Sequence, residues 1–189
     1  MLSSYHRGRK DDKEYAFSCT NGNTSVKYWE KQWLGDVGVV PKFGEKEAGK
    51  PYRARYGAYV VIPKKDRQTI VLVQAPNGAY FLPGGEIEAG ENHRQAIDRE
   101  MLEEVGFEVV LGRYFGEALE YFYSRHRDTY FEHPGYFYEV TSYEKVAQPT
   151  ETTNTIEWHT PEKALQLLKR GSHRWAVEQW LSKDNATNS

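Results

Sequence analysis

Hydrophobic and polar positions form a regular pattern only from about residue 56 onward. Residues 56–62 are rich in aromatic and β-branched side chains and end before Pro63, which predicts a strand. Residues 69–74 predict the returning strand, after a polar turn. The turn signal Pro76-Asn77-Gly78 then precedes a short predicted strand at residues 79–82.

The chain before residue 50 lacks such a pattern. Its hydrophobic positions are scattered among glycines and charged residues, so we expect residues 1–50 to form a polar, peripheral extension. An added subdomain or a dimerisation arm stays open as the alternative, and a homodimer stays open with it. We assign the folded domain to residues 51–183 and expect residues 184–189 to fray.

A helical pattern covers residues 92–105. Asn92 is a suitable N-cap, and Gly106 is a suitable residue just beyond the C-terminus. The segment Pro83-Gly84-Gly85 ahead of this helix predicts a loop. One face of the helix carries an apolar stripe that can pack on a sheet, made of Ile97, Met101 and Val105.

The region from Leu111 to Tyr143 is β-like and crowded with aromatic residues, with residues 124–128 as the expected hairpin tip. Pro134-Gly135 predicts a bulge or break, because proline cannot donate to a strand ladder. Thr160-Pro161-Glu162 begins a helix that Gly171 ends, and Ser172 can cap a last helix.

Composition narrows the class of protein. Against 27 Asp and Glu there are 25 Lys and Arg, which argues against a sequence-independent binder of nucleic-acid polymers. No apolar stretch is long enough to span a bilayer, so we expect no membrane partner. The first residues lack the apolar run of a secretory signal. The single cysteine, Cys19, fits a reducing compartment, and we expect a cytoplasmic protein.

Three glutamates occupy one face of the predicted helix. At about 100° per residue, Glu100, Glu103 and Glu104 fall within roughly one third of the helix circumference. Like charges at this spacing repel one another, and the negative end of the helix dipole disfavours them further. A divalent cation reverses both effects, since Mg²⁺ prefers carboxylate oxygens. The cluster therefore predicts a metal site.

The spacing of these residues resembles the Nudix box. Gly85, five residues, Glu91, seven residues, Arg99-Glu100, and then Glu103-Glu104 before Val105-Gly106 match its defined positions. The resemblance to the Nudix hydrolase superfamily (MutT-like) extends over about residues 56–181. It implies an α/β (α+β) fold with a mixed, curved β-sheet sandwiched between helices. It also implies hydrolysis of a nucleoside diphosphate linked to another group. It also implies Mg²⁺ or Mn²⁺ as cofactor.

The resemblance implies a role for each box residue. Glu100, Glu103 and Glu104 would bind the metal together with the carbonyl of Gly84. Arg99 would orient Glu100, and Glu91 would support the loop. For the general base two candidates stay open: Glu100, and Glu151 in a later loop.

The substrate is not identified by the sequence. Candidates for substrate binding are Arg53, Arg55, Tyr123, Arg125 and Arg127, although solvated turns and aromatic packing are the favoured explanation for most of them. We expect a small nucleotide: a dinucleoside polyphosphate, a nucleoside triphosphate or a nucleotide sugar. The alternative is a non-catalytic Nudix module that binds a nucleotide or a protein partner. The complete set of box carboxylates favours the enzyme.

Overall fold

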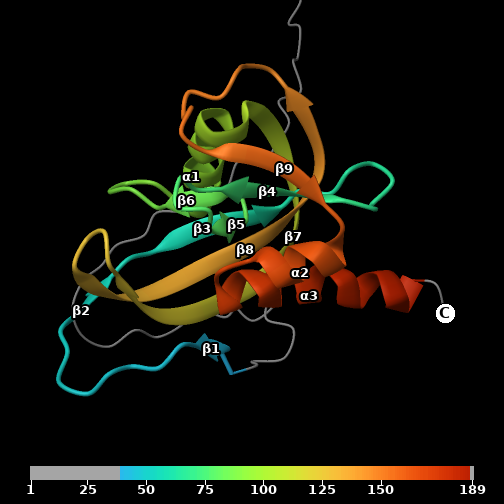
Figure 1. Ribbon diagram of the computed structural model, residues 1–189. Helices are drawn as coiled ribbons and strands as arrows, with labels where there is room; N and C mark the ends of the chain where they lie inside the picture. Colours follow the sequence, from blue (N-terminus) through green and yellow to red (C-terminus); the bar gives the residue numbers. More distant parts are fainter. Residues whose placement is uncertain (1–38, 188–189) are drawn as a thin grey trace, which may run out of the picture. The chain divides into compact units, whose positions relative to one another are not determined.

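The computed structural model describes residues 39–187 (Figure 1). Residues 1–38 and 188–189, which hold most of the predicted extension, Cys19 and the end of the predicted tail, lie outside the described residues. The elements are β1 (Lys42–Phe43), β2 (Tyr52–Ala54), β3 (Gly57–Val61), β4 (Ile70–Gln74), β5 (Tyr80–Phe81), β6 (Gly84–Glu86), α1 (His93–Glu100), the π-helix η2 (Met101–Val105), β7 (Phe107–Ser124), β8 (Thr129–Lys145), β9 (Thr155–His159), α2 (Pro161–Leu167) and α3 (Gly171–Thr187).

Two sheets carry the fold. The larger sheet has the order β1-β7-β8-β3-β6, with β2 also paired to β8, and it mixes parallel and antiparallel pairs. The smaller sheet, β5-β4-β9, is antiparallel. Figure 1 shows α1 and η2 on one side of β3 and β8, and α2 and α3 on the other. This arrangement confirms the predicted α+β class with a mixed, curved sheet between helices.

Strand β3 is buried on both faces, and its alternating residues divide between two cores. Ala58, Val60 and Ile62 pack with the helix formed by α1 and η2. Tyr59 and Val61 pack with α2 and α3. Because β3 is covered on both faces, its position is fixed by both cores. Strand β6 pairs antiparallel with it, so β3 also fixes the position of β6.

We call the continuous helix formed by α1 and η2 the central helix. Its predicted apolar stripe is confirmed as core. Ile97 and Met101 are fully buried, and Val105 is nearly so. We expect Ile97→Ala to lower the free energy of unfolding by about 2–5 kcal/mol, because it removes methyl groups and leaves a cavity. Leu102→Ala is the matched control, since Leu102 is 39% exposed on the same helix. Urea unfolding measures both, and equal losses would contradict this packing.

The ends of the central helix follow the predicted caps. The Asn92 side chain accepts from the Gln95 N–H, and Gln95 accepts from the Asn92 N–H, which completes a capping box. Gly106 has φ +72°, and its N–H bonds the Met101 carbonyl. The predicted helix over residues 92–105 is confirmed, and its last part, residues 101–105, is wound more widely, as a π-helix.

Two local predictions were wrong. Gly84–Glu86 is a short strand paired with β3 rather than a loop.

Pro134 causes no break, contrary to the prediction. It lies in a continuous β8, opposite Leu119, and the irregularities of the β7–β8 pairing lie between Val110 and Gly116 instead. The Leu119 N–H donates to Pro41, away from β8. On the other side of β8, pairing with β2 ends at residue 132 and pairing with β3 begins at residue 135. The missing Pro134 N–H therefore interrupts no ladder.

The described part of the predicted extension joins the sheet. Residues 42–43 form β1, which pairs in parallel with β7 at Leu119 and Glu120. A side chain at Gly44 would overlap the Tyr121 carbonyl, so the turn after β1 needs glycine at its φ of +69°. At the other end of the chain, α3 continues to Thr187, into the predicted tail.

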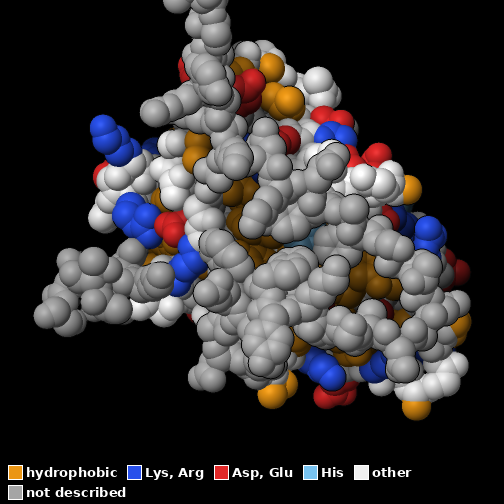
Figure 2. All heavy atoms as spheres, turned by 180° about the vertical axis from the view of Figure 1, so that it is seen from behind, with side chains coloured by type: hydrophobic (Ala, Val, Ile, Leu, Met, Phe, Trp, Pro, Cys, Tyr) orange, Lys and Arg blue, Asp and Glu red, His pale blue; other side chains and the backbone are white. Residues whose placement is uncertain are grey.

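Surface charge is mixed on the visible face of the molecule. Where described residues are visible in Figure 2, Lys and Arg side chains lie among Asp and Glu side chains rather than in a single patch. Within residues 39–187, no helix combines the length and the apolar character needed to cross a bilayer.

Candidate active site

Two glycines bring β6 close to β3 and to the central helix. Gly84 has φ +124°, and a side chain there would overlap the Ala58 carbonyl on β3. A side chain at Gly85 would overlap the carboxylate of Glu100. Because both positions lack a Cβ, the β6 backbone can lie against the glutamates of the helix.

Arg99 is the centre of an ion-pair network. Its Nε and Nη2 donate to the two Glu91 oxygens at 2.8 and 3.0 Å. Its Nη1 donates to Glu100 at 2.8 Å and to Glu103 at 3.2 Å. Nη2 also donates to the Glu86 carbonyl. The hydrogen bond from Arg99 holds the pKa of Glu91 below its ordinary value. A planar fork with several donors is needed for such a network.

Glu104 is the most buried of the three clustered glutamates. Its Oε2 accepts from the Gly84 N–H at 2.9 Å, and Asn154 Nδ2 lies 3.5 Å from its Oε1. Burial raises the pKa of Glu104 to about 8, against the opposing bond from Gly84, and nearby Glu100, Glu151 and Glu103 raise it further. A carboxylate held among like charges is a group that a cation would stabilise.

A later loop reaches the same cluster. The Glu151 N–H donates to the Glu103 carbonyl at 2.9 Å. Asn154 Nδ2 donates to Glu151 Oε2 at 2.9 Å while it also contacts Glu104. The charge of Glu151 is one cause, after burial and the opposing Arg99, of the raised pKa of Glu100. The structure thus brings the predicted candidate Glu151 to the box glutamates.

The carboxylate cluster fits a hard divalent cation in its donor chemistry. Every donor is an oxygen, as Mg²⁺ and Mn²⁺ prefer, and within residues 39–187 no cationic side chain is bonded to the buried Glu104. Among the described residues, no three His, Cys, Asp or Glu side chains already converge as a ligand set. Arg99 instead binds one oxygen of Glu100 and one of Glu103.

We expect the metal-free protein to lose stability as pH rises from about 6.5 to 8.5. The pKa of Glu104, about 8, lies above its unfolded value of 4.5. Its contribution is therefore complete below pH 4.5 and is lost as pH rises through 8. The lowered pKa values of His133 and His173 affect stability only below about 6.5, so they do not contribute in this window.

Glu104→Gln isolates this carboxylate. Urea unfolding in EDTA should show a parent that loses roughly 2 kcal/mol across the window and a variant that loses much less. Parallel pH profiles for the two proteins would mean that Glu104 ionises normally.

A cavity of about 200 Å³ opens beside this cluster. It connects the carboxylate of Glu104 and the two glycines of β6 with a group of basic and aromatic side chains. Its lining is Arg55, Tyr59, Val73, Ala75, Phe81, Gly84, Gly85, Glu104, His133, Asn154, Arg170 and His173. The cavity therefore has an acidic end and a basic end.

The predicted substrate-binding residues divide into two groups. Arg55 lines the cavity, and Arg127 lies 3.8 Å from Glu86, to which Arg55 also binds. Arg53 and Arg125 are exposed and do not line it. Tyr123 is 43% exposed and donates to Asp128 within its own hairpin.

Sequence reasoning missed several residues of the cavity: Asn154, His133, Arg170 and His173. Each comes from an element far from the box in sequence, and none belongs to a motif. A signal was available only for Asn154, which lies three residues after the predicted candidate Glu151.

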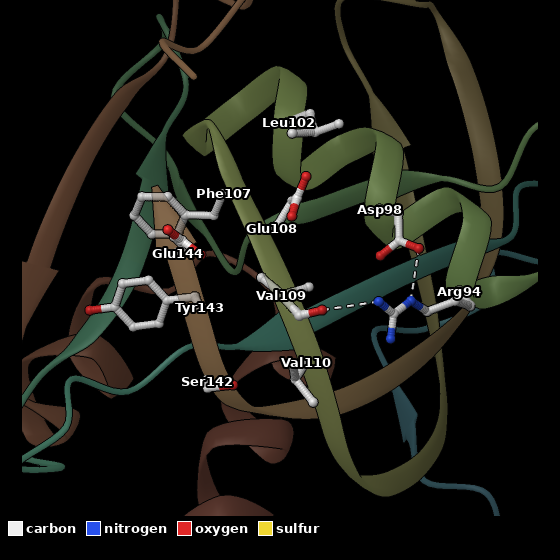
Figure 3. Close-up of a pocket in the computed structure, with 10 residues that line it drawn as sticks. All are labelled: Arg94, Asp98, Leu102, Phe107, Glu108, Val109, Val110, Ser142, Tyr143 and Glu144. Atoms are coloured by element: carbon white, nitrogen blue, oxygen red, sulfur yellow. Dashed lines mark hydrogen bonds and ion pairs between the residues drawn. The ribbon is translucent and has the colours of Figure 1, made fainter. Parts of the chain in front are cut away.

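A larger groove of about 520 Å³ lies on another side of the central helix (Figure 3). Arg94 bridges it by donating to Asp98 at 2.8 Å and to the Val109 carbonyl at 3.0 Å, as Figure 3 shows. Its lining includes none of the predicted catalytic or metal residues. Size therefore does not identify the site, and we assign it to the smaller cavity by its chemistry.

Comparison with known proteins gives matches over the same region. The family model described as NUDIX domain matches residues 51–181. The protein named "Putative 8-oxo-dGTP diphosphatase" of Bacillus subtilis (strain 168) is 29% identical over 105 residues, which are 56% of this chain and 66% of that protein. The NAD-capped RNA hydrolase NudC of Vibrio cholerae serotype O1 is 40% identical over 60 residues, which are 30% of this chain and 22% of that protein.

The matched part spans less than two thirds of either relative. Among solved structures, MutT from a study of Aliivibrio salmonicida and Vibrio cholerae aligns with a TM-score of 0.54 at 22% identity, over 69% of this chain and 99% of the other. At this identity the likeness concerns the fold.

Proposed function

The chain belongs to the Nudix family, and we propose that it is a divalent-metal-dependent pyrophosphohydrolase of small nucleotides. The observation that carries this proposal is the position of Glu104. Its buried carboxylate lies against the Gly84 N–H, among three other glutamates, at the end of a cavity that also holds two arginines. A cation and a polyanionic substrate together would neutralise both ends of that cavity.

In this proposal, Glu100, Glu103 and Glu104 hold Mg²⁺ or Mn²⁺ with the Gly84 carbonyl. The cation would neutralise phosphate charge and orient the anhydride. Arg99 positions the glutamates, since its guanidinium binds Glu91 through two nitrogens and Glu100 through a third. Glu91 in turn accepts from the Glu88 N–H, which ties the loop to the helix.

We assign the general base to Glu151. Its Oε2 accepts from Asn154, which leaves Oε1 to take the proton of an attacking water. The contact of Asn154 with Glu104 keeps this carboxylate beside the cluster. Glu100 is the alternative base, but its Oε1 is bonded to the cationic Arg99, and in this proposal Glu100 also binds the metal.

The substrate is tested by a panel assayed with Mg²⁺. The panel contains 8-oxo-dGTP and dGTP, a dinucleoside polyphosphate, a nucleotide sugar and NAD-capped RNA, since two of these occur in the names of the relatives. Chromatography resolves the products, and ¹⁸O-water identifies the phosphorus attacked. We expect turnover of a small nucleotide with cleavage of an anhydride. Binding without turnover of any compound would favour the alternative, a non-catalytic module.

A further inference from the structure

The basic end of the cavity is built from three separated parts of the chain. Arg55 lies between β2 and β3, His133 lies in β8, and Arg170 lies between α2 and α3. None of them belongs to the box, and the proposed metal site does not use them. The hydrogen-bonding groups of these three side chains that lack partners among the described residues indicate what this end of the cavity can bind.

Arg170 is a largely buried cation whose donors are unused. Its guanidinium lies 3.2 Å over the Phe122 ring, and its side chain is 18% exposed. Within residues 39–187 the guanidinium donates no hydrogen bond, and the nearest carboxylate oxygen, of Glu120, is 4.0 Å away. Glu120 already accepts from Ser172 N and Oγ and from Gly171 N at the start of α3. Among the described residues, Arg170 therefore has only a distant ion pair, with Glu120, and no carboxylate hydrogen-bonded to it.

Arg55 adds a second positive charge to the same cavity. Its Nε donates to Glu86 Oε2 at 2.9 Å, but Glu86 is shared with Arg127 and is 41% exposed. The terminal nitrogens of Arg55 make no hydrogen bond within the described part of the chain. Burial lowers the pKa of Arg170, and the charge of Arg55 lowers it further against the attraction of Glu120. Two guanidinium groups thus repel each other across this space.

His133 is a neutral side chain that lines the same cavity as the two arginines. It is 3% exposed, and its Nε2 lies 3.1 Å from the Tyr59 hydroxyl. Burial raises the pKa of Tyr59 to about 12, so its hydroxyl is protonated and can either donate to Nε2 or accept from it. His133 Nδ1 has no hydrogen-bond partner within the described residues, and it carries the ring hydrogen when the Tyr59 hydroxyl donates to Nε2. Burial lowers the pKa of His133 to about 3, and the charges of Arg170 and Arg55 lower it further, while the Arg55 backbone has the opposite effect. The ring is therefore neutral at neutral pH.

We infer that Arg55, Arg170 and His133 form a subsite for an anionic group of the substrate, separate from the carboxylates that hold the metal. An anion would satisfy the unused donors and remove the repulsion between the arginines. An uncharged sugar or base would leave the repulsion between the two arginines in place and add no charge opposite Arg170, whose nearest carboxylate oxygen is 4.0 Å away. The cavity, about 200 Å³, is smaller than sites that enclose whole ligands, so it takes one group, a phosphate or a carboxylate.

That the bound anion is part of a substrate rests on the proposed function. The test of anion binding does not depend on that function. The full-length protein is titrated with inorganic phosphate, and separately with acetate, in EDTA at constant ionic strength. Calorimetry gives the affinity, and the nitrogen resonances of the His133 ring report the site. Because neither metal nor turnover is involved, a failure of the hydrolase proposal leaves this measurement unchanged.

We expect saturable binding of phosphate by the parent and a shift of the His133 Nδ1 resonance. Arg170→Met should weaken binding at least about tenfold, as expected when charge-assisted hydrogen bonds are lost. Arg94→Met is the control, because Arg94 lies in the other groove, and it should bind like the parent. Tighter binding of phosphate than of acetate would identify a phosphate group, and the reverse would identify a carboxylate.

Equal phosphate affinities of Arg170→Met and the parent would overturn the inference. It would also be overturned if the parent bound neither phosphate nor acetate saturably. If Arg170→Met does not fold, Arg55→Met provides the same comparison at a position closer to solvent. The inference then requires the same loss of at least about tenfold.

Discussion

Glu104→Gln should lower kcat by at least about a hundredfold, because a ligand of a charge-neutralising cation contributes several kcal/mol to the transition state. The metal-free variant should be at least as stable as the parent above pH 7. Glutamine can still accept from the Gly84 N–H through its oxygen, while it removes the carboxylate whose pKa burial raises to about 8. Loss of activity together with retained stability separates a metal ligand from a packing residue.

Two controls sharpen this result. Glu103→Gln should show the same loss of kcat, although Glu103 is more exposed and bonds to Arg99. Glu108→Gln changes an exposed glutamate four residues beyond Glu104 and should leave kcat unchanged. Mg²⁺ should raise the melting temperature of the parent more than that of Glu104→Gln. A variant that is fully active, or that unfolds without metal, would show that Glu104 has been assigned wrongly.

Arg99→Met should cost the metal-free protein about 3–5 kcal/mol of stability, the usual effect of removing one partner from buried ion pairs. The loss would leave Glu91 and Glu100, whose side chains are only 19% and 12% exposed, without a cation. Activity should fall as well, because in the proposal Glu91 holds the loop and Glu100 is a ligand of the metal.

Arg99→Lys distinguishes charge from geometry. Lysine restores a positive charge but cannot bind Glu91 through two nitrogens and reach Glu100 and the Glu86 carbonyl at once. We therefore expect Arg99→Lys to recover only part of the stability and little of the activity. Full recovery by lysine, measured by urea unfolding and kcat, would reduce Arg99 to a simple counter-charge.

Local chemistry allowed the central helix to be predicted well. Its caps, Asn92 and Gly106, are determined by side-chain and backbone preferences within a few residues. The stripe of Ile97, Met101 and Val105 follows from helical periodicity. The same local reasoning failed at Gly84–Glu86, since two glycines indicate a loop unless a neighbouring strand is known to pair with them.

Non-local arrangement explains the rest of what was missed. Pro134 predicted a break because the pairing on either side of β8 could not be known from the sequence. In the site, the box residues are close in sequence, so one motif indicates them together. Arg170, His133 and Asn154 meet Arg55 only because β3, β8 and the segments beside α2 and β9 fold onto one cavity. No periodicity links such residues.

The central claim is that carboxylates of the box act through a divalent cation on a phosphoanhydride. The most direct measurement is the turnover, by the full-length protein, of the nucleotide that the panel identifies, first in excess EDTA and then after Mg²⁺ is restored. The proposal predicts no turnover in EDTA, recovery with Mg²⁺, and no recovery in Glu104→Gln. Full turnover by the parent in excess EDTA would contradict it.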